Sequence, residues 1–341
     1  RSRKRLVEVS PAMSAAAAAV DQARSGLALV RSATAPQLGF DLIGTNTNNP
    51  AQAFMGELNA RELSLAGGLG DTDPTTHVSA GLHASMLLWD GGRLGAMEVA
   101  AEAGVAAAGS AAEARAHALT MELNELWWGL FVTRELAEGV EARGDALAAA
   151  LESAQARVDA GTGLRSDVLS LEASELARQA ELIQARSTEA SIQRSLDALL
   201  GIPPEAAHEF VELGEYTSKL GGAEQLADQL PELLADARSL RPDLRALQQQ
   251  VLAREAELTA AERGSSPTLS AFADTWLDGG TPAYELDRGS YTVGAALSWN
   301  LYDGGTREAR SGQARAGLRA ARAQLATAVD ATETTKLCAI A

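Results

Sequence analysis

Aromatic residues make up only 4% of the 341 residues, and the chain has a single cysteine, Cys338. One cysteine can form neither an internal disulfide nor a zinc site built from several thiolates. The four histidines, His77, His83, His117 and His208, are scattered without the spacing of metal ligands. The sequence therefore predicts no metal centre, and it implies no cofactor.

Motifs of the common enzyme classes are missing too. There is no Gly-x-Ser-x-Gly motif, and no nucleophile stands beside a base in the sequence. Gly67-Gly68-Leu69-Gly70 lacks the strand-to-helix context of a nucleotide-binding loop, and we interpret it as an ordinary loop. We therefore predict that the protein is not an enzyme.

Basic residues are fewer than acidic ones, 29 against 45, and the net charge is −16. A nucleic-acid binder needs a basic face, so a nucleic-acid partner is excluded. No run of 18 or more apolar residues occurs, so the sequence predicts no transmembrane helix.

Helix-forming residues are what the chain has in excess. Stretches rich in Ala, Leu, Glu, Arg and Gln predict helices at residues 11–35, 93–160, 164–200 and 231–263, and a last helix from Thr306 onward. We expect the fourth of these helices to be kinked at Pro242.

The helix predicted at 93–160 would be about 100 Å long at 1.5 Å per residue. Its leucines follow coiled-coil spacing, in steps of four, three and four residues, at Leu119, Leu123, Leu126 and Leu130. With one step skipped, a similar spacing continues at Leu136, Val140, Leu147 and Leu151. We therefore predict a long helical hairpin that turns at Gly161-Thr162-Gly163.

Alternation of apolar and polar residues predicts four strands, at residues 37–45, 78–88, 268–276 and 291–301. The segment between the first two, 46–76, is rich in Asn, Gly, Thr and Pro and is predicted to be a long loop. Residues 205–230 are predicted to be a small irregular segment.

An internal repeat is the most specific signal in the sequence. Pro11 and Pro36 recur as Pro242 and Pro267, 231 residues later, and Trp89-Asp90-Gly91-Gly92 recurs as Tyr302-Asp303-Gly304-Gly305, 213 residues later. The apolar face of the second strand, Val78 to Leu88, aligns in phase with that of the fourth, Tyr291 to Leu301. The chain therefore contains about one and a half copies of one unit of helix, strand, loop, strand, turn and long helix.

Strands with one apolar and one small or polar face suit a water-filled barrel in lipid. Four strands cannot close a barrel, and open strand edges are not viable in hydrocarbon. Several copies must then contribute strands to one barrel.

This pattern resembles the outer membrane efflux protein family, of which TolC is the best-known member. The resemblance is carried by the passages at 87–93 (LLWDGGR) and 301–305 (LYDGG), the turn at 158–169 (VDAGTGLRSDVL) and the tail at 196–201 (LDALLG). It covers nearly the whole chain, and the order and spacing of these motifs carry it.

The resemblance implies an α+β membrane protein, with long coiled-coil hairpins as a periplasmic tunnel and four strands per protomer in a 12-stranded trimeric β-barrel. It implies a homotrimer in the cell outer membrane, in contact with its lipid, that works as the passive exit duct of a tripartite efflux or type I secretion system. The implied partners are a periplasmic adaptor (membrane fusion) protein and an inner-membrane transporter. We expect an export signal to lie outside this sequence.

The implied domain organisation follows the chain: an N-terminal tunnel helix (1–35), the first barrel hairpin (36–90), the long helical hairpin (91–200), an equatorial mixed segment (201–230), a tunnel helix (231–264), the second barrel hairpin (265–303) and the start of a second long helix (304–341). The second tip and its returning helix are missing, so we expect a C-terminally truncated member or a fragment.

Two groups of site residues follow from the resemblance. The periplasmic entrance and adaptor-docking tip comprises Gly161, Gly163, Leu164, Ser166 and Asp167. The barrel-to-tunnel turns comprise Asp90, Gly91, Gly92, Asp303, Gly304 and Gly305. Asp167 matches an aspartate that lines and helps constrict the entrance in the family.

Plainer interpretations stay open for single features. Asp167 suits the first turn of a helix as an ordinary solvated or capping charge. Trp127-Trp128 suits helix packing or a ligand platform. For the whole chain, the alternative is a soluble periplasmic coiled-coil adaptor. Such an adaptor also has long hairpins but lacks four amphipathic strands in two duplicated hairpins, so we favour the channel.

Overall fold

The computed structural model describes residues 10–61, 74–203, 241–279 and 289–340. The chain divides into two compact units: one comprises residues 1–20 and 108–243, and the other residues 21–107 and 244–341. None of the helices in these ranges is both long enough and apolar enough to cross a membrane. The predicted irregular segment at 205–230 and the helix start at Pro231 lie outside the described residues.

The first unit is dominated by a helical hairpin. Helix α4 (Arg93–Asp159) runs unbroken for 67 residues, of which those from 108 onward belong to this unit, and α5 (Arg165–Leu200) returns for 36. The hairpin core contains leucines from both helices, each of them 7% exposed or less: Leu119, Leu123, Leu130, Leu196 and Leu200. Leu126 packs against this core, so the first part of the predicted leucine spacing is confirmed.

In the second part of that spacing Val140, Leu147 and Leu151 are buried or half-buried as predicted, and only Leu136 was assigned wrongly. Leu136 is 52% exposed, whereas its neighbour Ala137 is 6% exposed. Buried and half-buried positions recur in steps of three and four, at Ala137, Val140, Gly144, Leu147 and Leu151. We term the line of contact between α4 and α5 the seam. Ala137 lies in the seam although Leu136 is the larger residue, because a small side chain there lets the two helices approach closely.

A half-buried arginine of α5, Arg178, packs against the smallest residue of this seam, Gly144. An added Cβ at Gly144 would lie 3.1 Å from Cζ of Arg178, so the glycine leaves close-fitting space for the guanidinium. Arg178 donates to the carbonyl of Val140 at 3.3 Å and to both carboxylate oxygens of Glu175 at 2.6 and 2.8 Å. Hydrogen bonds from Arg178, and then from Gln179, lower the pKa of Glu175 from 4.5 to about 2. The pair therefore stabilises the fold above pH 4.5 and loses that contribution as pH falls toward 2.

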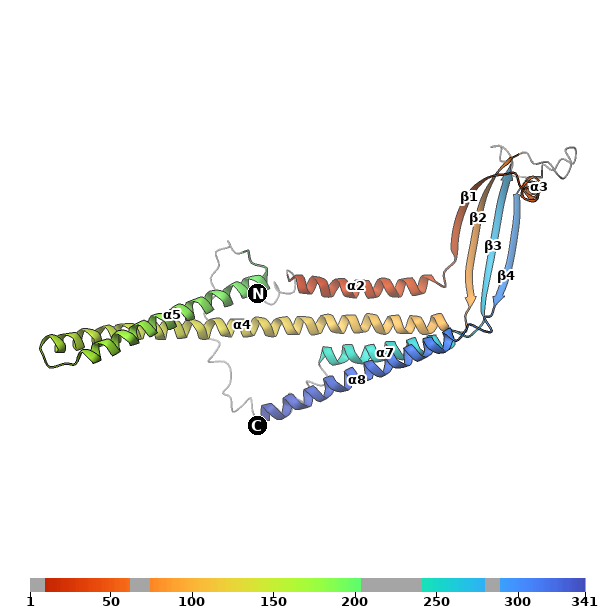
Figure 1. The fold of residues 1–341 in the computed structure, drawn as a ribbon. Helices are drawn as coiled ribbons and strands as arrows, with labels where there is room; N and C mark the ends of the chain where they lie inside the picture. Colours follow the sequence, from red (N-terminus) through yellow and green to blue (C-terminus); the bar gives the residue numbers. More distant parts are fainter. Residues whose placement is uncertain (1–9, 62–73, 204–240, 280–288, 341) are drawn as a thin grey trace. The chain divides into compact units, whose positions relative to one another are not determined.

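The second unit contains one antiparallel sheet of four strands in the order β1-β2-β3-β4, which lie side by side in Figure 1. The strands are β1 (Gln37–Thr47), β2 (Thr75–Trp89), β3 (Thr268–Gly279) and β4 (Gly289–Ser298). The strand predicted at 291–301 was extended too far, because β4 ends at Ser298. Beyond it the indole N–H of Trp299 donates to the carbonyl of Ser265 at 3.0 Å.

The loop predicted at 46–76 is partly wrong, because α3 (Pro50–Asn59) lies within it. The side chain of Asn49 accepts a hydrogen bond from the backbone N–H of Ala51 at 3.0 Å, and Pro50 occupies the first turn. Both are helix-start signals that the abundance of loop-forming residues around them obscured.

The other helices of this unit are α2 (Pro11–Ser32), which begins in the first unit, α7 (Pro242–Arg263) and α8 (Thr306–Ile340). The prediction that Pro242 kinks a helix is wrong, since Arg241 lies outside any helix and Pro242 begins α7. Proline suits this position because its missing N–H would have no helical partner there.

Ion pairs tie the helices together in pairs, with reversed charge in the two repeats. Arg31 of α2 contacts Glu98 and Glu102 of α4 at 2.6 and 2.7 Å. At the equivalent positions, Glu262 of α7 contacts Arg315 of α8 at 2.9 Å. Position 31 corresponds to 262, and position 102 to 315, so the acid and the base have changed places.

The phase of the hairpin seam can be tested with two matched substitutions. Leu130→Ala should lower the free energy of unfolding by about 2–5 kcal/mol, because Leu130 is 4% exposed. Leu136→Ala should cost much less, since that side chain already contacts solvent. Thermal and denaturant unfolding followed by far-ultraviolet circular dichroism would measure both. Equal losses would contradict the assignment of Ala137 to the seam.

Candidate functional site

The two strand-to-helix turns have the same geometry. The Asp90 carboxylate accepts hydrogen bonds from the N–H groups of Gly92 at 3.1 Å and Leu94 at 2.8 Å, and so caps α4. Gly91 and Gly92 have φ of 71° and 80°, a region that favours glycine.

In the second turn, Asp303 accepts from Gly305 at 3.1 Å and from Arg307 at 2.9 Å, and so caps α8. Gly304 and Gly305 have φ of 67° and 86°. Each turn thus fixes the direction in which a strand passes into a long helix.

A tight turn joins α4 to α5. Gly161 has φ of 73°, and the N–H groups of Thr162 and Gly163 both donate to the carbonyl of Arg157 at 2.9 Å. An added Cβ at Gly163 would lie 2.9 Å from the backbone nitrogen of Val158, so this position also requires glycine. The two predicted glycines of this turn are therefore needed for its shape.

Asp167 lies in the first turn of α5 and is exposed. The residue at the N-cap position is Leu164, and no side chain forms a hydrogen bond there. Asp167 is therefore not the N-cap, although a carboxylate in this turn is favoured by the helix dipole. Leu164 is 67% exposed, which leaves an apolar side chain in solvent beside the acidic one. Ser166 is exposed too.

The sheet sorts its side chains onto two faces. Phe40 lies opposite Leu82, Leu82 opposite Thr275 and Thr275 opposite Tyr291, and directly paired residues share a face. The face that contains this row, which we term the apolar face, carries Leu38, Phe40, Leu42, Leu82, Met86, Leu277, Tyr291, Val293 and Leu297. Leu82 and Met86 of β2 thus share a face with Val293 and Leu297 of β4, as the alternation in the sequence predicts. Most of these large side chains are exposed in a single copy.

The opposite face, termed the polar face, holds two small hydrogen-bonded groups. Asp278 accepts from the hydroxyl of Ser79 at 2.6 Å and contacts Nε2 of His77 at 3.1 Å. Nearer the middle of the strands, Asp41 contacts Nδ1 of His83 at 3.2 Å. Within the described residues no group of His, Cys, Asp and Glu is arranged to hold a metal ion.

Three glycines on the polar face each lie under a ring. A Cβ added to Gly39 would overlap the imidazole of His83, one added to Gly81 would overlap the indole of Trp276, and one added to Gly294 would overlap the ring of Phe272. Each ring therefore reaches over the backbone of the neighbouring strand at its glycine. Sequence analysis did not single out Trp276 or Phe272, although each follows the two-residue alternation of β3.

Helix α3 contacts β2 and β3 and covers the end of the polar face. Gly56 lies against the ring of His77, where an added Cβ would be 3.3 Å from Cγ. On the other side of α3, Met55 and Leu58 are 51% and 45% exposed.

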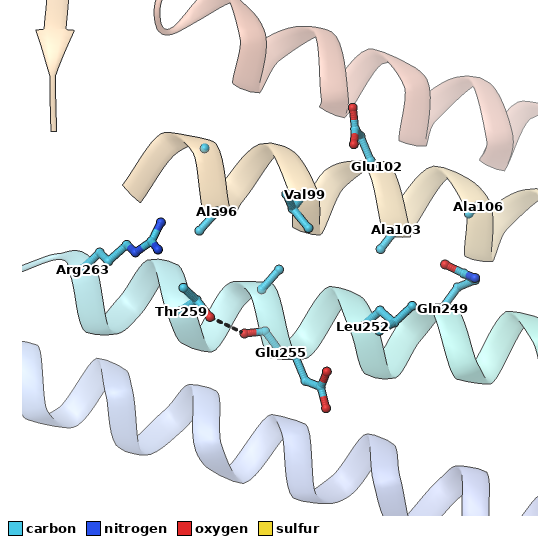
Figure 2. Close-up of a pocket in the computed structure, with 12 residues that line it drawn as sticks. Ala96, Val99, Glu102, Ala103, Ala106, Gln249, Leu252, Glu255, Thr259 and Arg263 are labelled. Carbon is cyan, nitrogen blue, oxygen red and sulfur yellow. Dashed lines mark hydrogen bonds between the residues drawn. The ribbon is translucent and has the colours of Figure 1, made fainter. Parts of the chain in front are cut away.

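A groove of about 650 Å³ runs between α4 and α7 (Figure 2). Its floor consists of small side chains, among them Ala96, Ala103 and Ala256. Glu102 and Glu255 point away from each other, toward α2 and α8 (Figure 2). The residues that line this groove include no cluster of reactive groups. Their small side chains let α4 and α7 lie close together.

A family model described as "Outer membrane efflux protein" matches residues 3–202 and 233–333. No curated protein sequence matches the chain. Solved structures share its fold. The outer membrane protein VceC of Vibrio cholerae is 17% identical with a TM-score of 0.76, over 96% of this chain and 74% of that one.

Two further channel structures align over nearly the whole chain. The open state of the MtrE outer membrane channel of Neisseria gonorrhoeae is 19% identical with a TM-score of 0.73, over 97% of this chain and 70% of that one. The CmeC outer membrane channel of Campylobacter jejuni is 12% identical with a TM-score of 0.76, over 97% and 68%.

Proposed function

This chain belongs to the outer membrane efflux protein family, and on that premise we propose that three copies close one continuous duct. Membership makes it part of an outer-membrane efflux channel with its long helices in the periplasm. A soluble periplasmic adaptor is not favoured, because such a protein needs no sheet with an apolar face.

The proposal of a trimer rests on the open edges of the sheet. Within the described residues β1 and β4 each pair with only one strand, so each keeps one row of unpaired backbone groups. Such edges are costly in hydrocarbon, and closing a barrel removes them. Three copies of four strands give the 12-stranded barrel, with the apolar face toward lipid and the polar face toward water.

We propose that the duct is passive and that the hairpin tip is its periplasmic entrance. The tip offers exposed Leu164 next to exposed Asp167, a surface on which an apolar contact from a periplasmic adaptor protein could form. Gly161 and Gly163 hold the turn, and Ser166 lies in the first turn of α5. An inner-membrane transporter would supply both the cargo and the energy.

Trimer formation is the first test. Extracted in mild detergent, the protein should have the mass of three copies by native mass spectrometry or sedimentation. A stable monomer whose four strands are all intact would rule out the shared barrel.

The assignment of the apolar face to lipid predicts that an arginine destabilises the protein more on this face than on the polar face. Leu82→Arg places a guanidinium toward lipid and should cost about 2–4 kcal/mol near mid-membrane. Ser85→Arg, on the polar face of the same strand, should cost far less. Folding into lipid vesicles with denaturant titration measures both. Similar costs would show that the faces are reversed or that the sheet does not span lipid.

The entrance assignment predicts a change in ion conduction. Three copies of Asp167 would ring a narrow opening, and carboxylate rings attract cations. Asp167→Ala should lower cation selectivity or raise conductance in planar-bilayer recordings, without loss of the trimer. Asp159→Ala, at the end of α4, is the matched control and should have a smaller effect. Unchanged conductance and selectivity in Asp167→Ala would mean that this aspartate only stabilises its helix.

A further inference from the structure

Helix α3 (Pro50–Asn59) lies at the end of the sheet that is farthest from the long helices (Figure 1). It follows β1 and precedes β2, whereas the two Asp-Gly-Gly turns follow β2 and β4 at the other end of the strands. Its length is about 15 Å at about 1.5 Å per residue. A sheet of four strands is about 14 Å wide at about 4.8 Å per strand, so the helix is long enough to cross it.

Contacts at both ends of α3 show that it does cross the sheet. Near its start, the hydroxyl of Thr47, the last residue of β1, donates to the side-chain oxygen of Gln52 at 2.9 Å. Just after its end, Arg61 donates to the carbonyl of Gly289, the first residue of β4, at 3.3 Å. The helix therefore runs from β1 toward β4 and contacts β2 and β3 between them.

The middle of α3 rests on the polar face. Gly56 packs against the imidazole of His77, since an added Cβ would lie 3.3 Å from its Cγ. Asp278 of β3 fixes this ring, because its carboxylate contacts Nε2 of His77 at 3.1 Å and accepts the hydroxyl of Ser79 at 2.6 Å. The helix therefore lies on the side of the sheet that we assign to the water of the duct.

The bore of the proposed barrel is narrow compared with this helix. Twelve strands about 4.8 Å apart and tilted by about 40° form a barrel about 24 Å across between backbones. A helix with its side chains is about 10 Å thick, so one α3 from each of three copies along the inner rim would leave an opening of about 4 Å. Water would pass such an opening, whereas a drug-sized solute would not.

The remaining opening would be apolar. Met55 and Leu58 lie on the side of α3 away from Gly56 and are 51% and 45% exposed, although they stand on the water side of the sheet. Apolar constrictions stop conduction by losing their water. A ring of these side chains would therefore hinder ions as well as larger solutes.

Helix α3 is held weakly enough to move. None of its ten residues is buried. A helix of this length is marginal by itself in water, and elements with little buried apolar surface are the first to open. Loss of the contact between Gly56 and His77 would free its middle without breaking any pairing between strands.

We propose that α3 is a movable gate at the outer end of the duct. The gate is closed in the observed conformation, and it opens when α3 leaves the polar face. The proposal rests on the duct proposed above, because only a closed barrel turns the polar face into a bore. It adds a point of regulation at the exit, at the end of the duct opposite to the hairpin tip.

Labelling of a thiol from outside the cell tests the gate. In a Cys338→Ser background, Ser85→Cys places a thiol on the polar face of β2, eight residues beyond His77, which is about 26 Å at about 3.3 Å per residue. A maleimide on a large polyethylene glycol, added to intact cells, should label this thiol slowly. Gly56→Val should push α3 off the imidazole of His77 and speed that labelling about tenfold or more.

Two controls accompany this experiment. Met55→Val introduces the same side chain on another side of α3 and should leave the labelling rate unchanged. N-ethylmaleimide, which crosses membranes, should label Ser85→Cys equally in all variants, because the barrel itself is intact. Equal labelling by the large reagent in the parent and in Gly56→Val would overturn the gate and leave the duct standing. Rapid labelling of Leu82→Cys by the large reagent would instead overturn the proposed function, since that residue should face lipid.

A disulfide tests the gate in the opposite direction. A Cβ at position 56 would lie 3.6 Å from Cβ of His77, within the range of about 3.5–4.5 Å that disulfides adopt. Gly56→Cys with His77→Cys should therefore bond on oxidation and hold α3 on the sheet. Labelling of Ser85→Cys by the large reagent should then fall below its rate without the lock. An unchanged rate, or no disulfide in a trimeric protein, would overturn the gate.

Discussion

The unpaired edges of a four-stranded sheet are the constraint on which the rest of this structure depends. Backbone N–H and C=O groups need partners, and a sheet immersed in hydrocarbon finds them only by closing. One chain supplies too few strands to close, so its two halves must each be able to continue into another copy. The duplicated hairpins meet this need with two equivalent halves, in each of which a capped turn, at Asp90 or Asp303, leads a strand into a long helix.

Much of this architecture could be predicted from the sequence, because its signals are local. Strand alternation, the two Asp-Gly-Gly turns and the glycine tip each need only a few neighbouring residues, and the turn residues form the hydrogen bonds that cap the helices. The errors arose where packing partners decide. Leu136 fits a coiled-coil pattern, yet Ala137 is the buried residue. Packing against the facing helix decides between these two neighbours, and the sequence of one helix does not show it. Helix α3 was missed inside a glycine- and asparagine-rich stretch, although Asn49 and Pro50 mark its start.

The candidate sites divide in the same way. The roles of Gly161, Gly163 and the turn glycines follow from backbone conformation, which the sequence indicates and the geometry explains. A role for Asp167 cannot be deduced from one chain, because a ring of carboxylates exists only after copies assemble. The reversed ion pair, Arg31 with Glu102 against Glu262 with Arg315, was equally hidden, since each helix alone carries ordinary surface charges.

The rings that cover Gly39, Gly81 and Gly294 determine how far the polar face projects from the sheet. A ring that stands straight up from its own strand projects its full length, whereas one that reaches over a neighbouring glycine uses the space that a Cβ would fill. Glycine on one strand and an aromatic residue on the next therefore form a matched pair, and a larger residue at Gly81 would push the indole of Trp276 away from the sheet.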